Sequence, residues 1–381
     1  MEVSSFGQLA LSGLVAAILP LGMVWMSSDP NKFRKLVWLC AFLTFDLVVF
    51  GAFTRLTDSG LGCPDWPGCY GAANPFVAHA QISAAEALLP TGPVTVIKAW
   101  IEMIHRYLAM GVGYICMALM ATAWIQWRKT KQAVFSPWLP TALFLAVCVQ
   151  GALGKWTVTL KLQPVIVTMH LLTALGLLAM MCWLGKRQDA AVGVGVGAGA
   201  VVDGASLIHP TVSLQRLALV SALVLAVQIA LGGWVSTNYA TLACNEFPLC
   251  AGKLVPEMDF GHGFTLWREL GKTAAGHYLP FSALTAIHWV HRNFAFVLIA
   301  VLGLTAWRAA RYVALRKIAR GIWAVLGVQA LTGISTIYFD FPLAIAVLHN
   351  AGAAILVVLV AMLNYQTRHP SGATAQARSH Q

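Results

Sequence analysis

Two copies of a short polar motif lie inside apolar segments and contain residue types that bind and act on cofactors. The first is Ile-Glu-Met-Ile-His-Arg at 101–106, where Glu102 and His105 are three residues apart and share one face of a helix. The second, Ile-His-Trp-Val-His-Arg at 287–292, ends in His291 and Arg292. Burying such side chains among apolar residues costs free energy unless they have polar partners. Both motifs therefore predict a functional site.

One more histidine follows each motif roughly sixty residues later, namely His170 and His349. Each of the four histidines is about seven residues inside its apolar segment, which places all four ~10 Å below one membrane surface. Imidazoles at equal depth on facing helices suit axial ligation of a porphyrin iron from both sides. One such histidine alone would more simply be a core residue, and a structural zinc site would use closer ligands and thiolates. Four histidines at matching positions of an internal repeat therefore predict two haem sites.

Arg106 and Arg292 directly follow the histidines of the two motifs. Arginine can bind a haem propionate bidentately. It can equally form a structural ion pair or hold backbone carbonyl groups, because the residue after a helical histidine points ~100° away from it. Both interpretations stay open, and either places the arginines around the haem ligands.

The position three residues before the motif histidine differs between the copies: Glu102 in the first, His288 in the second. A buried carboxylate beside a porphyrin face can take protons or stabilise a developing positive charge. This asymmetry assigns the reactive site to the first copy and an electron-transfer or structural haem to the second. The alternative is that Glu102 forms an ion pair with Arg106 or Lys98.

Four cysteines form two Cys-x5-Cys motifs, Cys63 with Cys69 and Cys244 with Cys250. They allow three pairings, and the short local spacing favours one disulfide within each motif. Each pair is either a structural disulfide that stabilises its loop or a redox-active pair. The redox-active interpretation is stronger for Cys63 and Cys69 than for Cys244 and Cys250. The remaining cysteines are predicted core residues, namely Cys40, Cys116, Cys148 and Cys182.

The elements that position these residues are membrane helices. The 381 residues are 59% hydrophobic and only 10% charged, against about 25% charged in soluble proteins. The net charge of +11 resides in short loops between apolar runs, which indicates membrane topology and excludes a nucleic-acid partner. Predicted spans are 7–27, 36–56, 98–125, 138–159, 164–185, 214–237, 283–307, 319–339 and 343–364.

The loops richest in Lys and Arg are predicted to be cytoplasmic. The poorer loops, 57–97 and 238–282, then face outward together with the N-terminus, and the C-terminus lies inside. We therefore expect a multi-pass protein of a bacterial inner membrane, with its cysteine loops in the periplasm.

An internal repeat organises the chain. Residues 51–69 align without a gap with 232–250, and His170 matches His349. The fold class predicted is an all-α integral membrane protein of two pseudo-symmetric four-helix bundles plus one extra N-terminal helix. The predicted domains are 1–35, the extra helix and a cytoplasmic turn; 36–187, the first half; 188–213, a Gly/Ala-rich cytoplasmic linker; 214–365, the second half; and 366–381, a polar cytoplasmic tail.

The run Phe-Thr-Arg-Leu-Thr-Asp-Ser-Gly-Leu-Gly-Cys-Pro-Asp-Trp-Pro-Gly-Cys at 53–69, the segment Glu-Met-Ile-His-Arg at 102–106, the cysteine repeat and the four histidines together resemble the haem A synthase family, in its bacterial, cysteine-containing type. The resemblance covers about residues 36–365. The leading helix and the Gly-rich linker depart from the family's basic eight-helix pattern.

The resemblance implies an oxidoreductase that converts the C8 methyl of haem O to the formyl group of haem A, for terminal cytochrome oxidase. His105 and His170 would bracket the substrate haem, and His291 and His349 would ligate a haem b in the second half. Glu102 would be the catalytic carboxylate. Expected partners are haem O, a haem O synthase, cytochrome oxidase assembly factors and membrane lipid, and a homo-oligomer stays open.

Two other functions compete with this one. A dihaem transmembrane electron-transfer cytochrome b would usually carry its haems near opposite membrane faces, whereas these four histidines share one depth. A duplicated transporter would favour broken helices and a midplane site, and the sequence predicts neither.

Overall fold

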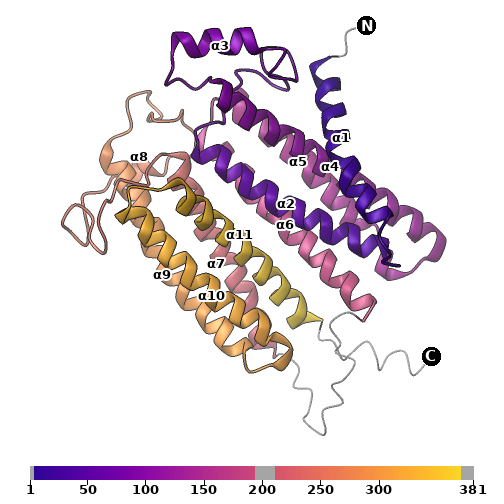
Figure 1. Ribbon diagram of the computed structural model, residues 1–381. Coiled ribbons are helices and arrows are strands. Elements are labelled where there is room, and N and C mark those ends of the chain that lie inside the picture. Colours follow the sequence, from indigo (N-terminus) through magenta and orange to yellow (C-terminus); the bar gives the residue numbers. More distant parts are fainter. Residues whose placement is uncertain (1–3, 194–210, 370–381) are drawn as a thin grey trace.

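The computed structural model describes residues 4–193 and 211–369, and within those ranges it contains helices and no β-strand (Figure 1). In this described part, nine helices are long and apolar enough to cross a membrane. They are α1 (Ser5–Trp25), α2 (Lys32–Leu56), α4 (Val96–Thr130), α5 (Trp138–Thr159), α6 (Pro164–Ala191), α7 (Val212–Thr237), α9 (Phe281–Ala309), α10 (Arg316–Tyr338) and α11 (Leu343–Arg368). The predicted all-α membrane class and the nine spans are confirmed.

Local sequence sets several helix starts. Asn31, Thr95 and Thr211 are N-cap residues whose side chains accept a hydrogen bond from a backbone N–H in the first turn of α2, α4 and α7. Pro164 occupies the first turn of α6, where its missing N–H costs nothing. Between these starts the spans are largely apolar, and the helix satisfies their backbone hydrogen bonds in lipid.

The helices pack as two four-membered rings. In the first half α2 packs on α4, α4 on α5, α5 on α6 and α6 on α2, and in the second half α7, α9, α10 and α11 repeat this order. Between the halves α6 packs on α7 and α11 on α2, which are equivalent contacts, and α6 packs on α11. A pseudo-two-fold axis therefore passes between α6 and α11, as the repeat predicts.

Helix α1 lies outside this symmetry and packs mainly on α4, at the edge of the first half (Figure 1). Gly13 of α1 allows the close approach: a Cβ atom at this position would lie 2.3 Å from Cγ of Met110 and 3.1 Å from the Met110 carbonyl carbon. Gly111 of α4 contacts Ala16 of α1 in the same way, with 3.3 Å to the alanine Cβ. The extra helix is thus seated by small residues, as is usual between membrane helices.

Some predicted boundaries were wrong. Helix α6 continues to Ala191 and α7 begins at Val212, so the predicted linker 188–213 is shorter; its residues 194–210 lie outside the described residues, as do 370–381 of the predicted tail. Asp189, assigned to the linker, is a buried helical residue that accepts a hydrogen bond from Nε1 of Trp38 (3.0 Å) and pairs with Arg34 and Lys186. The contacts of Asp189 with Trp38 and Arg34 hold the C-terminal end of α6 against α2. They explain why α6 continues past Asp189, where the sequence predicted a linker.

The long connections carry helices that the sequence did not reveal, α3 (His79–Leu88) in the first and α8 (Phe260–Gly263) in the second. The predicted equal depth of the four histidines stays a prediction, but their distances from the helix starts differ. Helices α4 and α9 begin at Val96 and Phe281, so His105 and His291 lie further from their helix starts than His170 and His349 do. All four still lie toward the end of the bundle that carries the cysteine loops.

The α1–α4 contact generates the first prediction. Gly13→Val should overpack the interface, which costs about 1–3 kcal/mol of stability, and lower the thermal unfolding midpoint of the protein in detergent. Gly22→Val is the matched control, because a Cβ at Gly22 meets nothing within 4 Å. Equal midpoints for the two variants would show that α1 does not depend on this contact.

Candidate functional site

Each of the four predicted histidines packs its ring against a glycine of the neighbouring helix in its own half. Because glycine has no Cβ, the ring can approach the backbone of that helix closely. The distances from a Cβ built on the glycine to Cε1 of the histidine are 3.1 Å for Gly51 and His105, 3.5 Å for Gly154 and His170, 2.9 Å for Gly232 and His291, and 3.4 Å for Gly333 and His349. The structure therefore repeats one histidine seat four times, on the helix pairs α2–α4, α5–α6, α7–α9 and α10–α11.

The histidines also meet in pairs across each bundle. His105 lies close enough to His170 to interact electrostatically, and His291 interacts in the same way with His349. Both members of the second pair line one largely apolar cavity, together with His288 and Arg292. Two imidazoles that border one apolar space suit the two axial positions of a haem iron.

Glutamine residues support three of the four seats, and sequence reasoning did not assign them this role. Gln150, Gln228 and Gln329 each precede the seat glycine by four residues, and their amide nitrogens donate to the backbone carbonyl of the histidine at 3.0, 3.2 and 2.7 Å. The seat of His105 has Leu47 at the equivalent position. The thrice-repeated Gln-x3-Gly spacing was a readable signal, since residues four apart share a helix face.

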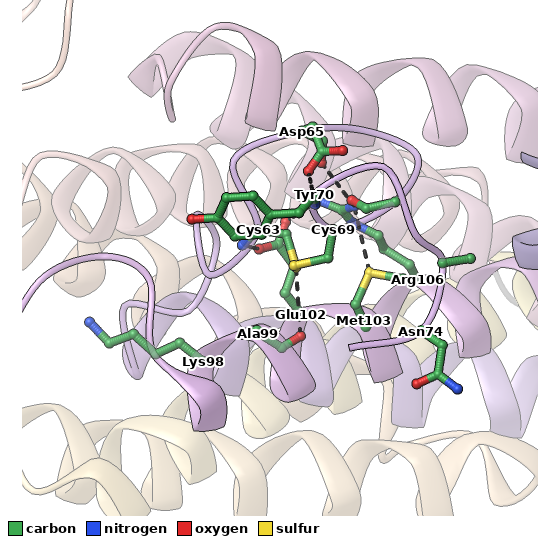
Figure 2. The surroundings of a disulfide bond; sticks show 12 residues. Cys63, Asp65, Cys69, Tyr70, Asn74, Lys98, Ala99, Glu102, Met103 and Arg106 are labelled. Carbon is green, nitrogen blue, oxygen red and sulfur yellow. Dashed lines mark hydrogen bonds and ion pairs between the residues drawn. A yellow bond between two sulfur atoms is a disulfide. The ribbon is translucent and has the colours of Figure 1, made fainter. Parts of the chain in front are cut away.

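The first cysteine loop is fixed on α4 by Glu102 and Arg106 (Figure 2). Cys63 and Cys69 form a disulfide. The backbone N–H of Cys63 donates to Oε2 of Glu102 at 2.8 Å, and Arg106 donates to the other carboxylate oxygen. Arg106 also donates to the backbone carbonyls of Asp65 (3.1 Å), Pro67 (3.1 Å) and Gly68 (2.6 Å).

The second cysteine loop repeats this construction with one exchange. Cys244 and Cys250 form a disulfide, and Arg292 donates to the carbonyls of Glu246, Pro248 and Leu249. The backbone N–H of Cys244 donates to Nδ1 of His288 at 3.3 Å, in place of the carboxylate. The residue exchange noted in the sequence therefore occurs at one structural position, directly under each disulfide.

These contacts bear on the two interpretations left open for the arginines and for Glu102. Arg106 holds loop carbonyls and an ion pair, which favours its structural interpretation; Arg292 holds loop carbonyls and also lines the cavity. Glu102 is buried, at 4% exposure, and pairs with Arg106. Lys98, the other cation considered, pairs with Asp58 instead. The carboxylate is thus held in one place beneath the loop, three residues from His105.

Comparison with known proteins identifies the family to which this chain is similar. The sequence profile of a family described as cytochrome oxidase assembly protein, COX15-CtaA, matches residues 34–361. The chain is 36% identical over 345 residues to a Heme A synthase of Shewanella oneidensis, a match that covers 90% of this chain and 99% of the relative. It is 31% and 28% identical to proteins of the same name from Sphingopyxis alaskensis and Caulobacter vibrioides, over 87% and 88% of this chain and 91% and 96% of theirs.

The unequal partners of the two arginines generate the second prediction. Arg106→Met should leave the buried carboxylate of Glu102 without its ion pair and three loop carbonyls without a donor. Breaking a buried ion pair lowers the free energy of unfolding by roughly 3–5 kcal/mol. Arg292→Met is the matched control, because it removes the donor of three loop carbonyls but breaks no ion pair with a carboxylate. Its loss of stability should be smaller. Thermal unfolding and limited proteolysis of the loop 57–97 measure both.

Adding Glu102→Gln to Arg106→Met should recover part of the lost stability, because no buried charge then stays unpaired. If the two arginine variants lose the same stability and the added glutamine changes nothing, the ion pair does not anchor the first loop.

Proposed function

Because the chain belongs to the cytochrome oxidase assembly protein family, COX15-CtaA, we propose that it acts as a haem A synthase. It would be a membrane oxidoreductase that converts the C8 methyl of haem O to a formyl group, a change that replaces two hydrogens by one oxygen and removes four electrons. The observation that carries the proposal is the pair of histidines that approach each other in each half, in a chain similar over nearly its whole length to proteins of that name.

The donor sets suit haem in both halves. We assign the substrate, haem O, to His105 and His170, and a resident haem b to His291 and His349. The glycine seats bring each imidazole to a defined place, and the apolar cavity around the second pair matches the apolar ring of a porphyrin. When bound, haem b supplies one-electron redox chemistry next to the first half.

Glu102 is the proposed catalytic carboxylate. Oxidation of a methyl group releases protons and develops positive charge at the carbon, and a fixed carboxylate can serve either need. Hydrogen bonds from Cys63 N–H and Arg106 hold this carboxylate in place. The second half has the imidazole of His288 there, which supports chemistry in the first half and electron transfer in the second.

The cysteine loops belong on the periplasmic face under this proposal, where disulfides persist. Through Cys63 N–H the first disulfide loop contacts the proposed catalytic acid directly, so a change in the loop would reach the site. The proposed partners are a haem O synthase that supplies the substrate and cytochrome oxidase assembly factors that receive haem A.

A dihaem cytochrome b that carries electrons across the membrane is the alternative. The four histidines lie toward one end of the bundle, in the N-terminal parts of α4, α6, α9 and α11, which start at the cysteine-loop end. Two haems at one end do not bridge the membrane, which disfavours this alternative.

The third prediction tests the reaction. Protein purified from a host that makes haem O, extracted with acidified solvent and chromatographed, should yield haem A and haem b. Glu102→Gln keeps the size of the side chain but removes its charge, and it should abolish haem A while haem b stays. The control His288→Gln should retain haem A. Haem b alone from the unchanged protein would favour the electron carrier.

The fourth prediction tests the assignment by halves. His291→Ala and His349→Ala should each abolish the low-spin haem b absorption spectrum, because one axial ligand is lost. His105→Ala and His170→Ala should leave that spectrum in place and stop haem A formation. A haem b spectrum that survives in His349→Ala would overturn the assignment.

A further inference from the structure

The two histidine pairs differ at Nδ1, the ring nitrogen that does not bind iron when Nε2 does. In the second half Nδ1 of His349 lies 2.9 Å from the hydroxyl of Thr332, and Nδ1 of His291 lies 3.2 Å from the side-chain amide of Gln228. In the first half Nδ1 of His105 and of His170 are buried and have no hydrogen-bond partner among residues 4–193 and 211–369. Duplicated sites would be expected to share such partners, so the difference needs a cause.

The cause is in the side chains of the neighbouring helices. By the same repeat that aligns the seat glycines, Leu153 stands where the second half has Thr332, and Leu47 stands where it has Gln228. Leucine can neither donate nor accept a hydrogen bond. The first-half histidines therefore have apolar neighbours at both positions, and Phe50 stacks near the His105 ring, at 6.1 Å between ring centroids.

Thr332 determines the tautomer of its histidine. A hydroxyl has one proton to donate, and that of Thr332 goes to the carbonyl of Val328 at 2.8 Å, one turn earlier in α10. The hydroxyl oxygen can then only accept from Nδ1 of His349. This fixes the proton on Nδ1 and leaves the Nε2 lone pair free for iron. Such partners orient a ligating ring and raise its basicity, and their removal typically costs 10–100-fold in metal affinity.

We propose that Thr332 makes the second histidine pair a retaining haem site, and that Leu153, at the matching position of the first half, makes the first pair a releasing site. This inference rests on the proposed function, in which the second half keeps its haem while the first must take up a substrate haem and let a product haem go. The two halves share the histidine seats and differ in how firmly each imidazole is held. Thr332 is thus a positioning residue for the haem of the second half.

The experiment measures haem release from each half without the oxidation reaction. Full-length His105→Ala/His170→Ala protein, loaded with protohaem, carries haem on the second pair alone, and excess apomyoglobin serves as the acceptor. Adding Thr332→Val, which has the shape of threonine but no hydroxyl, should speed transfer to apomyoglobin about 10–100-fold. It should also raise the midpoint potential, because the imidazole becomes a weaker donor. Thr332→Ser should restore both values.

Thr336→Val is the matched control. Thr336 lies one turn further along α10 and lines the same cavity, but its hydroxyl donates to the carbonyl of Gly333 and has no hydrogen bond to a histidine within residues 4–193 and 211–369. This variant should leave the release rate and potential unchanged. The reciprocal change, Leu153→Thr in a His291→Ala/His349→Ala background, should slow the release of haem from the first half.

Equal release from the Thr332→Val and Thr336→Val proteins, or an unchanged potential in Thr332→Val, would overturn the inference and leave the proposed synthase function intact. Fast release from Thr332→Val, together with a failure of the unsubstituted protein to make haem A from haem O, would support the retaining site and count against the proposed function instead.

Discussion

The close approach of a histidine ring to a glycine of the adjacent helix is the constraint on which the rest of this structure depends. It occurs four times, at Gly51, Gly154, Gly232 and Gly333. A Cβ at Gly232 or Gly51 would lie 2.9 or 3.1 Å from Cε1 of the histidine and would crowd the ring, whereas at Gly154 and Gly333 it would lie in ordinary contact. The close contacts therefore place His105 and His291 most strictly, on the equivalent helix pairs α2–α4 and α7–α9.

The cysteine loops show how one scaffold carries two different side chains at one position. In each half an arginine on the membrane helix holds three loop carbonyls, and the N–H of the first cysteine contacts the side chain three residues before His105 or His291. The arginine, the disulfide and the loop are shared. At this position only the acceptor differs, a carboxylate at Glu102 and an imidazole at His288, so the two halves share the loop geometry and differ in the side chain beneath it.

The residues next to Nδ1 of the paired histidines also differ between the two halves. The hydroxyl of Thr332 contacts Nδ1 of His349 in the second pair, whereas Leu153 occupies the matching place in the first half. A site that must exchange its haem gains from weakly held ligands, and a site that must keep its haem gains from firmly held ones. The Glu102 position and the Nδ1 partners thus favour the same division of labour between the halves.

The amino-acid sequence by itself determined the class, the nine spans, the repeat and the identity of the paired histidines, because apolar length and buried polar residues are local signals. Only the tertiary structure decided that Glu102 pairs with Arg106 and not Lys98, that the arginines hold loop carbonyls, and that Asp189 belongs to α6. Those outcomes depend on which side chains from distant segments meet. Thr332 shows this most clearly: its identity is visible in the sequence, but its contact with His349 exists only after α10 and α11 pack together.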